Sequence, residues 1–302
     1  MTVEATPDAL DEGLRDWLRE ECGPAADLLT YRGAPPVGRA HLFRIGSSRP
    51  GASDATGFYL KLFESRPAFE RERDAYLGWL TELEGVPRLV AIAPPPARAV
   101  LLSEVPGTRL TDRLRTRADA CAVMRAAGEW LRALHSLPIV DRDRLSVPLA
   151  LRDRMAHALA RGAGVISNDD RRWLASRFRN AEGFDGLERV ACHRDYQPRN
   201  WLVGVRDGRC DTFYVVDFEH TRSDLWLNDI VRLWCHHWPL DAQFETAFLA
   251  GYGRQLSEPD RDRLFELALL HAAATIVWAV EHDDEEFEAE GRELLARLRD
   301  DF

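Results

Sequence analysis

Apolar residues recur with two different periods along the chain, and the period changes near residue 106. Before that point, short segments rich in aliphatic and aromatic residues predict strands at 28–31, 40–45, 57–63, 89–92 and 99–102. Helical spacing is confined there to two stretches, 8–21 and 67–83. Pro106-Gly107 then breaks the pattern, so we expect one domain over 1–105 and a second over 106–302.

After the break the pattern is mostly helical. Helices are expected at 111–137, 149–160 and 169–181, and again from Asp229 to the end. Two short strand signals, 201–205 and 212–217, lie between them and are joined by the turn Asp207-Gly208. This order predicts an α+β chain with a small β-rich lobe, a larger helical lobe and a ligand site in the cleft between them.

The composition indicates a folded protein without a general affinity for nucleic acid. Apolar residues make up 45% of the 302 residues, and the formal net charge is −10, whereas nucleic-acid binding needs a basic face. The negative charge suits a cationic partner, but composition alone favours solubility as its explanation. The five cysteines are odd in number and contain no CxxC pair, which predicts a reduced, cytoplasmic protein without structural zinc.

Neither a secretory signal nor a membrane span is expected. The first residues are acidic and lack an apolar run. The longest apolar stretch, 267–280, contains His271 and is too short to cross a bilayer, so we expect a buried helix there.

One lysine, Lys61, stands among the 40 lysine and arginine residues. The chain otherwise uses arginine wherever a cation is present. A position that keeps lysine is either a chance survivor or needs a compact ammonium on a flexible stem, which a guanidinium does not mimic. Composition alone does not decide between these two interpretations.

The strongest chemical signal is the sequence HRDYQPRN at residues 193–200, which follows an apolar pair and leads into a predicted strand. Its Asp195 and Asn200 can converge on one small volume. Phosphoryl transfer needs a carboxylate that accepts the hydroxyl hydrogen and oxygen ligands that hold a metal on the phosphates. Asp217 ends a second apolar strand, where a carboxylate is costly to bury unless it binds a cation.

HRDxxxxN followed by an apolar strand that ends in Asp resembles the catalytic loop and metal-binding segment of the protein-kinase-like fold. The chain is most similar to the aminoglycoside phosphotransferase and choline kinase branch. That branch usually has HGDxxxxN, an Asp-Phe/Trp-Glu segment and a later Asp-Leu/Ile, and this chain has Asp217-Phe218-Glu219, Asn228-Asp229-Ile230 and Leu134-His135. The resemblance spans residues 28–233. Arg194 departs from the usual glycine, toward protein kinases.

The resemblance implies a two-lobed protein-kinase-like fold with a small antiparallel β-rich N-lobe and a larger, mainly helical C-lobe. It implies that Asp195 is the catalytic base and that Asn200 and Asp217 are ligands of Mg²⁺. His193 and Asp229 are expected to support the catalytic loop structurally. The co-substrate is ATP or GTP, which the sequence does not distinguish.

In the resembling family a lysine in the third strand contacts the phosphates and pairs with an acidic residue on the next helix. Lys61 occupies this place. Glu70 and Glu72 are both candidate partners, and we choose Glu72 because it shares a helical face with the inward stripe, whereas Glu70 is expected to face solvent. That stripe is expected to contain Phe69, Tyr76, Leu77, Trp79 and Leu80.

Two further nucleotide contacts follow from the resemblance. Glu104 and Val105 precede the lobe boundary and are similar to the linker whose backbone pairs with a nucleobase. The segment 31–39 contains two glycines but no GxGxxG. Its backbone amides are expected either to cover the phosphates or to form an ordinary turn.

The acceptor is the least defined part of the prediction. The acidic run 281–286 suits a polycationic antibiotic, with Asp283 and Asp284 as candidate contacts, but a solvated helix face explains it equally well. The resemblance implies an antibiotic O-phosphotransferase that acts on an aminoglycoside or similar cationic compound and confers resistance.

Three alternatives stay open from the sequence. A metabolic kinase of a hydroxylated amine, sugar or amino alcohol would use the same loop. A protein kinase is disfavoured because DFG and APE are absent and the segment 217–229 is too short for an activation loop. A non-catalytic nucleotide-binding module conflicts with the joint presence of the expected lysine, base and metal ligands.

Overall fold

The computed structural model describes residues 10–23, 28–30, 40–45, 57–110, 116–139, 145–178 and 181–300. The chain forms two compact units. Unit 1 comprises Met1–Arg113, Arg199–Gly204 and Asp211–Thr221, and unit 2 comprises Leu114–Pro198, Val205–Cys210 and Arg222–Phe302. Two segments that follow the HRD sequence therefore belong to unit 1 although they lie late in the chain.

Unit 1 is built on an antiparallel five-stranded sheet with the order β1-β2-β3-β5-β4. Its strands are β1 (Leu28–Thr30), β2 (Ala40–Ile45), β3 (Phe58–Phe63), β4 (Leu89–Ile92) and β5 (Ala99–Ser103). Two helices accompany the sheet, α1 (Glu12–Cys22) and α2 (Arg66–Leu77). Each begins at a side-chain cap, because Asp11 accepts from the Leu14 N–H and Ser65 accepts from the Ala68 N–H.

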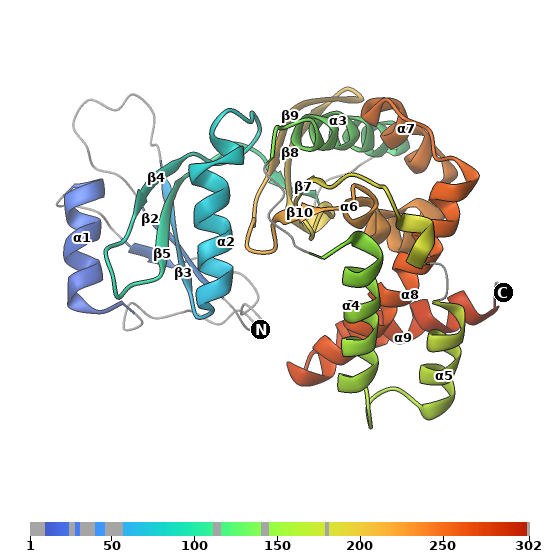
Figure 1. Cartoon of the computed structure of the whole chain (residues 1–302). Coiled ribbons are helices and arrows are strands. Elements are labelled where there is room, and N and C mark those ends of the chain that lie inside the picture. Colours follow the sequence, from blue (N-terminus) through green and yellow to red (C-terminus); the bar gives the residue numbers. More distant parts are fainter. Residues whose placement is uncertain are drawn as a thin grey trace. The chain divides into compact units, whose positions relative to one another are not determined.

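The two faces of the sheet carry different kinds of side chain, and α1 and α2 lie on opposite sides of it (Figure 1). Side chains alternate along β3, so Leu60 and Lys61 point to different faces. Leu60 is fully buried in a core formed by Leu14, Trp17 and Leu18 of α1 with residues of β2 and β5. Lys61 faces α2, where it meets Glu72. One face of the sheet thus packs in an apolar core, and the other carries the ion pair of Lys61 with Glu72.

The expected helix over 67–83 is wrong at its end. α2 stops at Leu77, and Trp79–Thr81 form a separate short 3₁₀ turn, η2. Gly78, a poor helix former, is the C-cap residue between them. Phe69, Tyr76 and Leu80 are buried as expected, but Leu77 is 60% exposed, so its place in the inward stripe was wrong.

A three-stranded sheet, in the order β6-β8-β9, follows the predicted break at Pro106-Gly107. Its strands are β6 (Thr108–Arg109), β8 (Trp201–Arg206) and β9 (Arg209–Val215). Gly107 has φ +115°, and a Cβ there would lie 3.0 Å from the backbone of Leu202 and Val203. Glycine is required because it permits both the conformation and the close approach.

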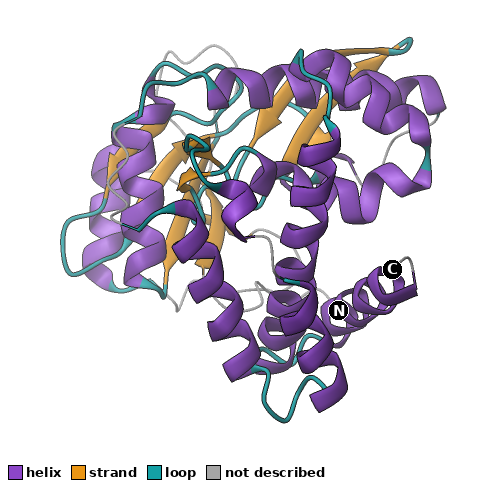
Figure 2. Ribbon diagram, turned by 45° about the vertical axis from the view of Figure 1, so that its right-hand side comes forward, coloured by secondary structure: helices purple, strands orange, loops and turns teal. Residues whose placement is uncertain are grey.

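Unit 2 is mainly helical, and helices make up the bulk of the ribbon in Figure 2. Its α-helices are α3 (Arg117–His135), α4 (Val147–Arg161), α5 (Asn168–Arg177), α6 (Leu227–Arg232), α7 (Ala242–Tyr252), α8 (Glu258–Glu281) and α9 (Glu285–Asp300). Shorter elements are η4 (Ala181–Phe184), η5 (Pro198–Asn200), which straddles the boundary with unit 1, the π-helix η6 (Leu233–His237) and η7 (Trp238–Leu240). A two-stranded antiparallel sheet pairs β7 (Val190–Cys192) with β10 (Arg222–Asp224).

The helix α8 fills the core of unit 2. It begins with a capping box formed by Ser257 and Asp260. Among the described residues it is the one helix long and apolar enough to cross a membrane, but 67% of its most apolar window is buried inside the protein. This burial identifies α8 as a core helix, as the apolar stretch 267–280 predicts.

Candidate active site

In unit 1, one ammonium group lies among three carboxylates. Lys61 Nζ is 2.6 Å from Glu72 Oε2, 2.6 Å from Asp217 Oδ1 and 3.5 Å from Glu219 Oε2. The Lys61 side chain is 10% exposed and that of Glu72 is fully buried. A compact ammonium can donate to several oxygens at once, which explains why this position carries lysine in an arginine-rich chain.

The electrostatics of this cluster keep Lys61 charged. Burial lowers the pKa of Lys61, but Asp217, Glu72 and Glu219 outweigh that effect and raise it. Burial is also the largest influence on Glu72 and raises the pKa of that carboxyl, helped by Asp217 and opposed by Lys61. The cluster has three carboxylates and only one ammonium, so it would attract a further positive charge.

The backbone brings Asn200 and Asp217 to the same part of unit 1. Strand β9 ends at Val215, and the next N–H, that of Val216, donates to the Asn200 carbonyl at 3.0 Å. Asp217 itself has φ +73°, which turns the chain out of the strand direction. Arg71 of α2 donates to the Glu219 carbonyl at 2.7 Å, which ties this segment to the helix that carries Glu72.

The cluster fits a magnesium ion by the chemistry of its donors. Carboxylate oxygens of Glu72, Asp217 and Glu219 lie within 4.8 Å of one another. Glu72 Oε1 is buried, and it has no hydrogen-bond partner among the described residues. Magnesium takes oxygen ligands and commonly keeps one or two carboxylates. Glu219 was not predicted as a site residue, although its place two positions after Asp217 could have indicated it.

In unit 2, the predicted base Asp195 is almost buried, with 5% of its side chain exposed. Its Oδ1 accepts from Gln197 Nε2 at 2.5 Å and lies 3.4 Å from Arg232 Nε. Neither partner was predicted from the sequence. Gln197 lies two positions after Asp195 and could have been considered, but Arg232 lies in the helical tail and gives no sequence signal. Asp195 belongs to unit 2, and Asn200 and Asp217 belong to unit 1, so their convergence stays a prediction.

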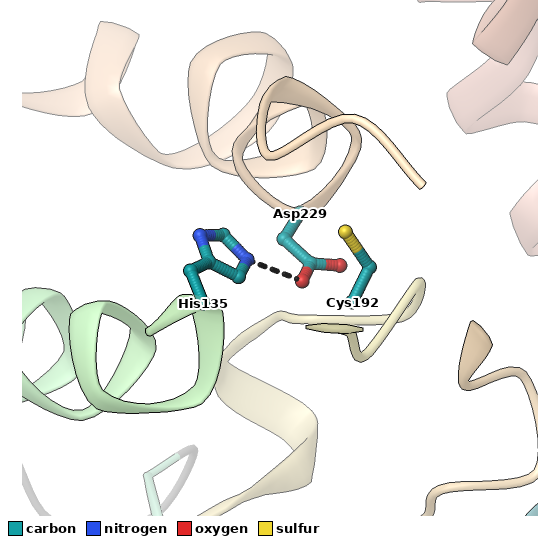
Figure 3. A group of neighbouring side chains, drawn as sticks. All are labelled: His135, Cys192 and Asp229. Carbon is teal, nitrogen blue, oxygen red and sulfur yellow. Dashed lines mark hydrogen bonds and ion pairs between the residues drawn. The ribbon is translucent and has the colours of Figure 1, made fainter. Parts of the chain in front are cut away.

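A buried network holds the loop that carries Asp195, and Figure 3 shows one part of it, the contact between His135 and Asp229. Asp229 accepts from the N–H groups of His193 and Arg194 at 2.8 and 2.6 Å. His135 Nε2 lies 3.0 Å from the same carboxylate, and its Nδ1 lies 2.8 Å from Tyr252 Oη. These bonds occupy both oxygens of Asp229, so this carboxylate stabilises the backbone of the loop.

Cys192 lies beside His135 and Asp229. Together the three residues form a set of possible metal ligands (Figure 3). The Cys192 thiol donates to the carbonyls of Asp224 and Leu225 at 3.4 and 3.3 Å. Burial raises the pKa of Cys192 well above its usual value, so the thiolate that binds metal is disfavoured. A metal is therefore a poor fit here.

Arg194, the departure from the usual glycine, has φ +70°. This left-handed conformation costs a residue with a side chain about 1 kcal/mol relative to glycine. Arg194→Gly and Arg194→Ala both lose the 2.6 Å ion pair with Asp224, so their difference isolates the backbone cost. We expect the glycine variant to be more stable by about 1 kcal/mol in denaturant unfolding. Equal stabilities would show that the loop does not hold this conformation in solution.

The lowered pKa of Asp224 leads us to expect that the protein loses stability in acid. Burial alone would raise its pKa, but Arg194, Arg154 and Arg222 outweigh burial and lower the pKa to about 2. Because the pKa is higher in the unfolded chain, the ionised carboxylate stabilises the fold above pH 4, and this contribution disappears as the pH falls through 4 toward 2. We expect the free energy of unfolding to fall by about 1 kcal/mol more in the wild type than in Asp224→Asn between pH 5 and pH 3.

The other predicted contacts have defined places. Glu104 pairs with Arg44 through two hydrogen bonds of 2.8 Å, and its N–H donates to the Gly57 carbonyl at 2.9 Å. This fixes the backbone that leads into Val105.

Asp283 is exposed, whereas Asp284 accepts from the Phe287 N–H at 3.0 Å and so caps α9. The segment 31–39 lies outside the described residues.

Comparisons with known proteins agree with this architecture. The profile described as phosphotransferase enzyme family matches residues 44–267. No curated protein matches the chain. Among solved structures, the GDP and kanamycin complex of APH(2")-IIia has a TM-score of 0.72 at 13% identity, covering 95% of this chain and 98% of that chain.

Two further solved structures show the same similarity. The ternary complex of a thermostable mutant of aminoglycoside phosphotransferase APH(4)-Ia with ADP and hygromycin B has a TM-score of 0.70 at 14% identity, covering 95% and 97%. The gentamicin complex of APH(2")-IIa has a TM-score of 0.67 at 15% identity, covering 95% and 96%. These similarities confirm the predicted fold class. Since the profile matches most of the chain, the chain belongs to the phosphotransferase enzyme family.

Proposed function

We propose that this phosphotransferase moves the γ-phosphoryl of a nucleoside triphosphate to a hydroxyl of an antibiotic, an aminoglycoside or a similarly cationic compound. The observation that carries the proposal is the position of Lys61, whose ammonium is 2.6 Å from both Glu72 and Asp217. Kinases use such a lysine, held by a helix carboxylate, to contact the phosphates. The same contacts place Lys61 beside the carboxylate expected to bind metal.

Each residue of the site has a task in this reaction. Asn200 and Asp217 would hold Mg²⁺ with Glu219 as a further oxygen donor, and the ion would neutralise charge on the phosphate oxygens. Asp195 accepts the proton of the acceptor hydroxyl, whose oxygen forms the new bond to the γ-phosphorus. The bond from that phosphorus to the bridging oxygen breaks, and the nucleoside diphosphate leaves. We assign nucleotide binding to residues 1–105 and catalysis and acceptor binding to 106–302.

The acceptor class rests on the similar solved structures, which are complexes with gentamicin, kanamycin and hygromycin B. At 13–15% identity they support the fold more strongly than the acceptor. A metabolic kinase acting on a hydroxylated amine, sugar or amino alcohol would use the same loop and is the alternative. A cytoplasmic location, where nucleoside triphosphates are abundant, completes the proposal.

A substrate screen tests the function. The purified full chain is incubated with ATP or GTP, Mg²⁺ and a panel of aminoglycosides, sugars and amino alcohols. We expect one class of acceptor to gain the mass of one phosphate while an equal amount of nucleoside diphosphate forms. Transfer to sugars or amino alcohols but not to antibiotics would favour the alternative. Nucleotide binding without transfer to any acceptor would contradict the proposed activity.

A further inference from the structure

One of the two side chains described above as contacting the predicted base is a cation. Arg232, the last residue of α6, places its Nε 3.4 Å from Asp195 Oδ1. Only 19% of the Arg232 side chain is exposed. The ring of Phe287 in α9 lies 5.5 Å from the guanidinium carbon and supports it by a cation–π contact. Arg232 of α6 is therefore held between Asp195 of the loop and Phe287 of α9.

Two histidines surround this arginine and carry no charge at neutral pH. His236 of η6 and His271 of α8 place their Nε2 atoms 3.4 Å apart. Burial lowers the pKa of His236 to about 3, with Arg232 as the next cause, and the same two causes lower the pKa of His271. Two carboxylates face this pair: Glu290 Oε1 lies 3.3 Å from His236 Nε2, and the charge of Asp195 opposes the lowering of the pKa of His271.

The backbone of this region is unusual in the same place. The α-helix α6 continues into the π-helix η6 directly after Arg232. A π-helical turn shifts the side chains that follow it relative to an α-helix, and such turns are often found at functional sites. Here it is the element that supplies His236 to the surroundings of Arg232.

We propose that Arg232 selects the acceptor. The acceptor presents a neutral or anionic oxygen group, such as a hydroxyl, amide carbonyl or carboxylate, beside the hydroxyl that is phosphorylated, and its ammonium groups lie elsewhere. This inference rests on the proposed function and specifies its acceptor. An ammonium next to the reacting hydroxyl would be brought close to the guanidinium that pairs with Asp195, and like charges in a partly buried site repel.

Two acidic residues, Glu281 and Asp284, agree with a separation of the acceptor's ammonium groups from its reacting hydroxyl. Asp284, a candidate for binding ammonium groups, is used as a helix cap, and Glu281 pairs with Arg161. Glu281 ends α8 ten positions after His271, roughly three helical turns away, and Asp284 directly precedes α9. Carboxylates can attract a cationic acceptor from a distance, whereas the cation that contacts the predicted base is Arg232.

A matched pair of acceptors tests the proposal. An aminoglycoside is compared with the same compound N-acetylated, because acetylation converts an ammonium into an amide carbonyl at the same position. The site of phosphorylation is located by NMR, and kcat/KM is measured for each form with acetylation at the amino group beside that hydroxyl. We expect the wild type to prefer the acetylated form, and Arg232→Gln to reduce this preference about tenfold.

Two further variants separate selection from a purely structural role. Arg232→Lys keeps the charge and should keep the preference even if its activity falls. Arg261→Gln removes an exposed arginine that pairs with Glu245, and it should leave the preference unchanged. The preference is a ratio within each variant, so losses of folded protein or of general activity cancel.

The outcomes are distinguishable. A wild type that prefers the ammonium form would overturn the inference without any variant. An unchanged preference in Arg232→Gln would show that Arg232 only braces Asp195. If no acceptor in either form gains a phosphate, the proposed function itself fails, and the inference fails with it.

Discussion

Replacing Asp195 by asparagine is expected to lower kcat by at least about a hundredfold while nucleotide affinity stays near that of the wild type. Asparagine has almost the same shape, and its side-chain oxygen can still accept from Gln197, so the loop should keep its structure. The amide cannot take the proton of the acceptor hydroxyl. Steady-state kinetics and calorimetric titration with nucleotide measure the two effects separately.

Asp262→Asn serves as the matched control, because Asp262 is an exposed aspartate of the same unit. It should change neither kcat nor nucleotide affinity. Retained turnover in Asp195→Asn would remove Asp195 from the role of base. A parallel loss of nucleotide affinity would mean that the substitution disturbs the fold of the loop instead of proton transfer alone.

The second large effect is expected from Asp217→Ala, which should weaken binding of the magnesium–nucleotide complex by at least about tenfold. The variant loses an oxygen ligand and also one of the two carboxylates that lie 2.6 Å from Lys61. Titration of nucleotide with and without Mg²⁺ measures the effect. The difference between the two affinities should shrink, because the metal no longer links nucleotide to protein.

Glu70→Ala is the control for this second prediction, since Glu70 pairs with Arg66 at the surface of unit 1. Its affinity should equal that of the wild type. If Asp217→Ala kept the full dependence on Mg²⁺, another group would hold the ion, and Glu219, 3.5 Å from Lys61, would be the first candidate. Glu219→Gln would then show the larger loss.

Regular elements with a clear period could be predicted from the sequence. The strand over 40–45 has the expected bounds, and the helix over 149–160 differs from α4 by only a few residues. Strands β6, β7 and β10 escaped prediction because two or three residues are too few to show a period. They exist because partner strands from distant parts of the chain supply their hydrogen bonds.

The sequence by itself determined which residues are candidates for the chemistry: the single lysine, the HRDxxxxN loop and Asp217, which was expected to end a strand but follows β9 by two positions. It also pointed to Glu72 over Glu70, because helical spacing alone decides which face of a helix a residue occupies. The structure pairs Glu72 with Lys61, while Glu70 bonds to Arg66.

Only the tertiary structure decided which groups surround those residues. Glu219 was found through its contact with Lys61, and Gln197 and Arg232 through their contacts with Asp195. Lys61 meets Asp217 across 156 positions of sequence. Contacts at such separations depend on the path of the whole chain, whereas periodicity reports only local geometry. Which charge lies next to Asp195 is therefore a property of the fold.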